Sequence, residues 1–110
     1  MPRNKNRSLV SLEVILDFSS GKNDARVSDL SLTGCFVDSI VQVTEGEKLT
    51  LTLNIPDRAW LALPGEVVYV LPGTGFGVRF TDLDENRLRE LEYAIKKHGG
   101  NPWGRDIVTE

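Results

Sequence analysis

Apolar and polar side chains alternate along most of the chain, and this spacing changes to a helical one after Thr81. The clearest stretch covers residues 49–55, where aliphatic side chains occupy every second position. Residues 12–18 and 76–80 follow the same pattern. Alternation of this kind is typical of strands that bury one face. A chain patterned in this way is expected to fold as a sheet or barrel, followed by one helix.

Turn-forming residues divide the alternating segments. Gly, Pro, Asn, Asp and Ser gather at residues 19–24, 45–47, 56–57 and 72–75. The 72–75 turn is consistent with a hairpin. A break at Thr33-Gly34 separates two strands, and Pro64-Gly65 predicts an interruption in the strand-like segment 60–71. Segments broken this often favour a small antiparallel barrel.

The helical segment has its own start signal. Leu88, Leu91 and Ile95 recur at helical spacing, and Asp84 is a suitable N-cap. The sequence therefore predicts an all-β fold with one C-terminal helix that covers an open end of the barrel. Three regions are expected: a flexible basic arm over residues 1–8, the barrel and helix over 9–98, and a tail over 99–110.

Composition narrows the possible functions. No run of about 18 apolar residues is present, so no membrane insertion is expected. A single cysteine, Cys35, allows no internal disulfide, which fits a reducing compartment and a cytoplasmic location. With one cysteine and one histidine, no dedicated zinc site is expected, and no metal ligands or catalytic residues are assigned. No nucleophile–base pair suggests itself, so no enzymatic activity is expected.

The charges are unevenly distributed. Of 13 basic and 16 acidic residues, Arg3, Lys5 and Arg7 fall in a segment without acids at the N-terminus. The remaining ten basic and sixteen acidic residues leave the rest of the chain acidic. Duplex nucleic acid normally requires a broad basic face, so binding to it is not expected. A small anion held by a few arginines fits this distribution better.

A second polar segment occurs at the end of a predicted strand. Asp29 and Ser31 are two residues apart, so an extended chain would place both on one face, with Leu30 and Leu32 on the other. If the leucines are buried, the acid and the hydroxyl lie on the outer surface. Gly34 would then mark a sharp turn or a point where a ligand approaches closely. A purely structural alternative is that Asp29 and Ser31 cap their own backbone.

The two polar segments together fit a guanine nucleotide. The forks of Arg3 and Arg7 match phosphate oxygens and the O6 and N7 edge of guanine. The Asp29 carboxylate can accept hydrogen bonds from the ring N–H and the exocyclic amine of guanine, which lie side by side. Adenine offers no such pair of donors. On its own, the basic segment would be read as a solvated terminus.

These residues also carry a family resemblance. RxxxR from Arg3 to Arg7, followed by DxSxxG from Asp29 to Gly34, resembles the PilZ domain. Residues 75–80 are similar to the closing strand of that family, and a helix follows where the family has one. Many members have another basic residue before the first arginine, where this chain has Pro2. The number of ligand molecules per site therefore stays open.

The resemblance implies a six-stranded barrel that binds the bacterial second messenger cyclic di-GMP. It assigns the grip on guanine and phosphate to Arg3 and Arg7. It assigns the guanine edge to Asp29 and Ser31, and the close approach to Gly34. Cyclic di-GMP is the expected ligand, and no further cofactor is implied.

The expected mechanism is a clamp, in which the arm is mobile without ligand and closes over a dianionic dinucleotide. The chain would then act as an adaptor that signals to an unidentified effector protein. Two other classes stay open: a PilZ-like interaction module that binds no nucleotide, and a barrel for single-stranded nucleic acid, which the acidic balance disfavours. Tyr69 is interpreted as a packing residue or as a stacking wall beside the ligand, and Arg79 as a surface charge.

Overall fold

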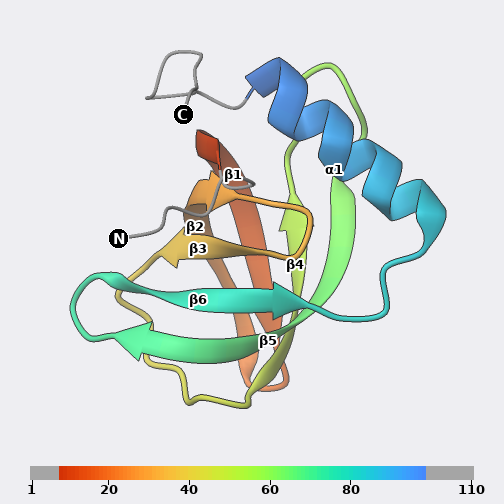
Figure 1. Ribbon diagram of the computed structural model, residues 1–110. Coiled ribbons are helices and arrows are strands. Elements are labelled where there is room, and N and C mark those ends of the chain that lie inside the picture. The colour runs from red at the N-terminus through yellow and green to blue at the C-terminus, as the bar shows by residue number, and fades with distance from the viewer. Residues whose placement is uncertain (1–7, 99–110) are drawn as a thin grey trace, which may run out of the picture.

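The computed structural model describes residues 8–98, which form an antiparallel barrel and one helix (Figure 1). Arg3, Arg7 and the predicted tail lie outside the described residues. The elements are β1 (Ser8–Phe18), β2 (Gly21–Leu30), β3 (Gly34–Asp38), β4 (Lys48–Leu53), β5 (Leu61–Leu71), β6 (Gly75–Phe80) and α1 (Glu85–His98).

The six strands of the described part close into a barrel in the order β1-β2-β3-β6-β5-β4. Every neighbouring pair is antiparallel, and β1 completes the ring by pairing with β4 from Val14↔Leu53 to Asp17↔Thr50. Closure leaves no strand edge exposed, which removes a site for unwanted strand pairing. The predicted all-β barrel with one C-terminal helix is confirmed.

Alternation along the strands builds the barrel interior. In β4, Leu49, Leu51 and Leu53 are buried while the intervening threonines are partly exposed, as the spacing predicts. The same holds in β6, where Phe76, Val78 and Phe80 are buried. The β5–β6 turn is also confirmed: Gly73 has a φ of 78°, and the Thr74 amide donates to the carbonyl of Leu71 over 3.0 Å.

The predicted interruption at Pro64-Gly65 is wrong, because β5 runs through both residues. Pro64 lacks an amide donor, but its carbonyl still accepts the Thr81 amide at 2.9 Å. Gly65 faces the interior, where a Cβ would come within 2.6 Å of Val78 Cγ1 and 3.0 Å of Leu51 Cδ1. The glycine thus meets a packing requirement inside a narrow barrel rather than ending the strand.

Helix α1 lies across one end of the barrel (Figure 1). The predicted N-cap is confirmed, since Asp84 Oδ1 accepts the amide of Arg87 at 2.8 Å. Leu91 and Ala94 are fully buried and belong to the barrel core. Within residues 8–98, no helix has the length and apolar content needed to cross a membrane.

Candidate ligand site

The DxSxxG segment forms the turn between β2 and β3. Strand β2 ends at Leu30, and the Ser31 amide donates to the carbonyl of Gly34 at 2.9 Å. The Ser31 hydroxyl oxygen accepts the amides of Thr33 and Gly34, each at 3.2 Å. The Phe80 amide donates to the carbonyl of Thr33 at 2.9 Å, which ties the turn to β6. The serine therefore holds the backbone of its own turn in place.

The expected common outer face for Asp29 and Ser31 is wrong. Ser31 is 4% exposed, whereas Leu32 is 37% exposed, the reverse of the expected pattern. The cause is that β2 ends at Leu30, so the alternation of side chains stops there. Beyond that point the serine side chain turns toward the backbone amides of the turn, as the structural alternative anticipated.

Gly34 is placed against the backbone of β6. A Cβ at this position would overlap the carbonyl oxygen of Val78 and would lie 3.3 Å from the Cα of Arg79. Gly34 pairs with Arg79 in the β3–β6 register. The backbone approach that requires a glycine here is therefore one between two strands of the protein.

Asp29 lies on β2 between two neighbouring strands, with Leu9 of β1 as its partner on one side and Phe36 of β3 on the other. Its side chain is partly exposed. Burial raises the pKa of the Cys35 thiol, and the negative charge of Asp29 raises it further. The carboxylate thus acts electrostatically at the start of β3, and Cys35 stays a protonated, buried thiol.

An aromatic pair continues the row that contains Asp29. Phe36 is paired with Gly77 of β6, and Gly77 is paired with Tyr69 of β5. The rings of Phe36 and Tyr69 are stacked, with centroids 6.1 Å apart and an interplanar angle of 28°. Gly77 lies beneath the tyrosine, since a Cβ there would meet its ring. Asp29, Phe36, Gly77 and Tyr69 are called the aromatic row below.

Sequence reasoning missed the role of Phe36 in this row. Phe36 lies in the strand that follows the predicted break at Thr33-Gly34, but the pairing across three strands cannot be read from local spacing. Tyr69 is 38% exposed, so it offers a ring face or edge to the surface while it covers Phe36. Tyr69 is therefore a packing residue against Phe36, and its role as a stacking wall beside a ligand stays a prediction.

The predicted arginines cannot be placed, because Arg3 and Arg7 lie outside residues 8–98. The first described residue, Ser8, is paired with Leu30, and the next, Leu9, is paired with Asp29. Consecutive Cα atoms are about 3.8 Å apart. The chain therefore enters the barrel directly beside the DxSxxG segment, one residue after the second arginine of RxxxR.

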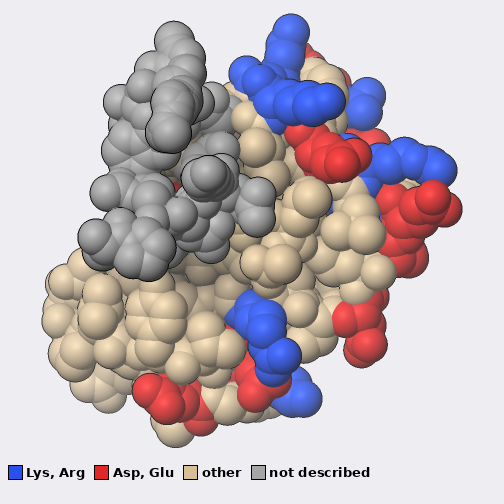
Figure 2. Space-filling view, in the orientation of Figure 1, with Lys and Arg blue, Asp and Glu red and all other residues tan. Residues whose placement is uncertain are grey.

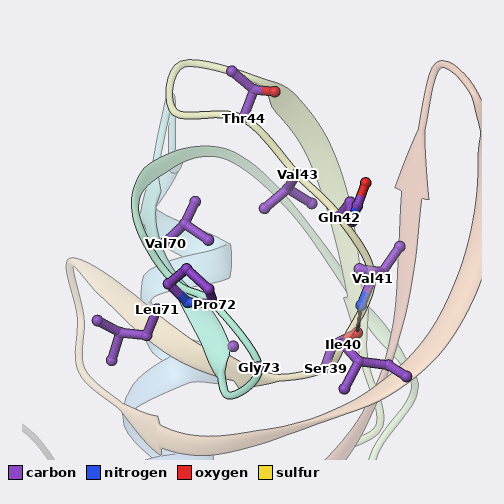
Figure 3. Close-up of a pocket in the computed structure, with 11 residues that line it drawn as sticks. Ser39, Ile40, Val41, Gln42, Val43, Thr44, Val70, Leu71, Pro72 and Gly73 are labelled. Carbon is purple, nitrogen blue, oxygen red and sulfur yellow. Dashed lines mark hydrogen bonds between the residues drawn. The ribbon is translucent and has the colours of Figure 1, made fainter.

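Two hollows occur elsewhere on the described surface. One, of about 500 Å³, lies between the segment that follows β3 and the β5–β6 hairpin (Figure 3). It is lined mainly by aliphatic side chains, including Ile40, Val41, Val43, Val70 and Leu71. The other, of about 490 Å³, lies over β1 and β2 beside Trp60, which is 47% exposed.

Comparison with known protein families decides what kind of barrel this is. The family model of the PilZ domain matches residues 2–97. The chain belongs to the PilZ domain family. The match begins before Arg3 and ends near the last residue of α1, so it includes RxxxR and DxSxxG. A search of curated protein sequences found no match.

Solved PilZ structures share the fold at low sequence identity. The PilZ domain of YcgR from Escherichia coli, solved with c-di-GMP, has a TM-score of 0.72 at 16% identity, covering 89% of this chain and 92% of that one. The motility inhibitor MotI/DgrA of Bacillus subtilis has a TM-score of 0.73 at 15% identity over 88% of this chain. The match spans 52% of MotI/DgrA, about half of its length.

A third similar structure is PlzA of Borreliella burgdorferi, solved in complex with c-di-GMP. It has a TM-score of 0.66 at 14% identity, covering 84% of this PilZ chain and 40% of that protein. Members of the family thus occur in bacteria and include proteins with this dinucleotide bound. In the described part of the present PilZ domain, no three His, Cys, Asp or Glu side chains are grouped as metal ligands.

Proposed function

We propose that this PilZ domain is a receptor for cyclic di-GMP and that the ligand lies against the aromatic row. The observation that carries the proposal is the β1–β2 register, in which Ser8 pairs with Leu30 and Leu9 with Asp29. The RxxxR segment immediately precedes Ser8 in the sequence, so the chain enters the barrel beside DxSxxG directly after this motif. The c-di-GMP complexes of YcgR and PlzA support the same ligand class.

The first set of contacts concerns the guanine base. Asp29 is partly exposed and next to Phe36, so its carboxylate can accept the ring N–H and amine of a guanine that lies on the aromatic row. Tyr69 presents the exposed side of that row. Stacking of a base on an aromatic side chain contributes about 1–3 kcal/mol. The base is therefore held by both its edge and its face.

The second set concerns the phosphates and the turn. Arg3 and Arg7 supply guanidinium forks for the phosphodiester oxygens and for a guanine edge. Ser31 contributes chiefly by ordering the turn, because its hydroxyl already accepts two backbone amides. Gly34 contributes by letting β3 approach β6 beside that turn. Both residues thus shape the surface that the dinucleotide contacts.

Binding would join the RxxxR segment to the barrel and so create a surface made of protein and ligand together. We propose that a partner protein reads this surface and that the domain acts as a cytoplasmic receptor rather than an enzyme. Ordering the segment costs free energy and so lowers the affinity. We expect a dissociation constant in the micromolar range or somewhat tighter, which corresponds to a binding free energy of about −8 kcal/mol or more favourable.

One observation favours a second candidate, an interaction module that binds no nucleotide. Ser31 and Gly34 are both accounted for by folding, the serine through its turn and the glycine through its contact with β6. These two residues of DxSxxG would therefore be needed in a PilZ domain that has lost its ligand. RxxxR lies outside residues 8–98.

Isothermal titration with cyclic di-GMP separates the two candidates. A receptor gives saturable binding with a defined molar ratio, and cyclic di-AMP binds much more weakly because adenine lacks the paired donors that Asp29 requires. Amide spectra of the ¹⁵N-labelled protein should change at residues 1–8 when ligand is added. No heat of binding at ligand concentrations up to about 1 mM would support the interaction module instead.

A further inference from the structure

The charged pair between β5 and β6 lies in the same row of the barrel as Gly34, the last residue of DxSxxG. Arg79 Nη2 is 3.1 Å from Glu66 Oε1, and the two side chains are 60% and 26% exposed. Arg79 pairs with Gly34 across the β3–β6 ladder, and Glu66 pairs with Arg79 on the other side. Figure 2 shows basic and acidic side chains over β5 and β6, next to an uncharged region.

The neighbour of Arg79 on the side of the turn has no side chain. Gly34 begins β3, and two strand spacings, about 10 Å, separate β6 from β2. Because Gly34 carries only hydrogens, nothing from its own side chain stands between the arginine and the turn. A ligand with two bases and two phosphates that rests on Asp29 is large enough to extend over this gap.

The ion pair between Arg79 and Glu66 is weak enough for the arginine to leave Glu66 with little loss of stability. An exposed ion pair of this kind contributes little to stability, and it weakens further with salt. Lys48 of β4 is the register partner of Glu66, on the side away from Arg79. Lys48 can therefore compensate the charge of Glu66 when the guanidinium turns toward an anion.

We propose that Arg79 is a third cationic contact for the ligand and binds a phosphodiester oxygen. When no ligand is bound, Arg79 is paired with Glu66 instead. The inference rests on the proposed function, because it concerns the same dinucleotide. It adds a contact on the barrel wall to the two arginines of RxxxR. Glu66 acts as an internal competitor, so its charge sets how tightly the domain binds its ligand.

The test is a titration of the whole chain with cyclic di-GMP. Arg79→Ala should weaken binding about fivefold to tenfold, because a charge-assisted contact with the ligand is lost. The same change removes the competing ion pair with Glu66, but that pair is weak and offsets only a small part of the loss. Arg79→Lys should be intermediate, because lysine keeps the charge but not the planar fork. The matched control is Arg89→Ala on α1, which removes an arginine that is 67% exposed and paired with Glu85.

Glu66→Gln tests the competition directly. It should tighten binding about threefold in the natural background and clearly less when combined with Arg79→Ala. An equal gain in affinity in both backgrounds would mean that Glu66 acts only as a general negative charge. This result would overturn the proposal that Glu66 competes with the ligand for Arg79. Melting temperatures of all variants should stay close to that of the natural chain.

Two further results would overturn the inference while the proposed function stands. One is an affinity for Arg79→Ala within twofold of the natural chain. The other is an equal loss for Arg89→Ala, which would show a general effect of net charge. Failure of the natural chain to bind cyclic di-GMP is distinguishable from both, since it removes the proposed function itself together with this contact.

Discussion

Replacing Gly34 with alanine would place a methyl group against the backbone of β6. The Cβ would overlap the carbonyl oxygen of Val78 and would come within 3.2 Å of the carbonyl carbon and 3.3 Å of Arg79 Cα. No side-chain rotation can relieve this overlap, because both partners are backbone atoms. The strands must separate at the point where the DxSxxG turn joins the barrel.

The expected loss of stability follows from that separation. Overpacking a tight interior costs about 1–3 kcal/mol, and each ladder hydrogen bond that is stretched or lost adds about 0.5–1.5 kcal/mol. We therefore expect Gly34→Ala to lower the free energy of unfolding by about 3 kcal/mol, the middle of the range for overpacking together with one lost hydrogen bond. For a domain of this size that corresponds to a fall in melting temperature of about 12–24 °C.

Gly77→Ala is the matched control. Its Cβ would meet the ring of Tyr69 rather than a backbone atom. Tyr69 is 38% exposed, so its side chain can move with less resistance than a backbone carbonyl. The expected loss is about 1 kcal/mol, at the lower end of the overpacking range. Combining Gly77→Ala with Tyr69→Ala should remove the overlap. The double variant should therefore lose less stability than the sum of the losses in the two single variants.

The stability of both variants would be measured by urea denaturation and by thermal melts monitored with circular dichroism. The folded variants would then be titrated with cyclic di-GMP. A Gly34→Ala protein that melts within about 4 °C of the natural chain but no longer binds would refute the reasoning. In that case the glycine would serve the approach of a ligand, as the sequence first suggested, rather than the contact between β3 and β6.

Four other predictions can be tested with the same assays. Arg7→Ala or Asp29→Ala should weaken cyclic di-GMP binding at least about tenfold with little change in melting temperature; loss of folding would indicate a structural role instead. Tyr69→Ala should weaken binding at least about fivefold through lost stacking, and an unchanged affinity would place the base elsewhere. Ser31→Ala should destabilise the fold by about 1–3 kcal/mol in urea, because two backbone amides lose their acceptor, whereas a purely ligand-contacting serine would leave stability unchanged. Because burial raises the pKa of Cys35 in the folded state, its contribution to stability is complete below about pH 8.5 and is lost as the pH rises above that value. Urea titrations from pH 7.5 to 9.5 should show that the free energy of unfolding falls less steeply with pH for Cys35→Ala than for the natural chain. Equal slopes for the two proteins would contradict this.

Local pattern was sufficient for the architecture. The aliphatic residues at every second position of 49–55 place Leu49, Leu51 and Leu53 in the core, and Asp84 caps the helix as its position predicts. Both features depend on backbone geometry within a few residues, so they can be read without knowing the fold. The interruption predicted at Pro64-Gly65 was wrong for the opposite reason. Whether β5 can continue through a proline and a glycine depends on which strands surround it.

The candidate site shows the same division. Alternation predicted Ser31 on the outer surface, but the end of β2 at Leu30 turned its hydroxyl toward backbone amides. Phe36 gave no functional signal in the sequence. It gained one only because the register aligns it with Asp29 on one side and with Gly77 on the other.

Taken by itself, the chain determined a strand-rich barrel with a closing helix, an acidic body with a cationic leader, and two motifs suited to a guanine dinucleotide. These follow from periodicity, charge and residue chemistry, which act over short stretches. Only the tertiary structure decided that Ser8 and Leu9 lie against Leu30 and Asp29, and that Gly34 lies against β6. Strand pairing joins residues far apart in the chain, and its register is set by how the whole barrel closes.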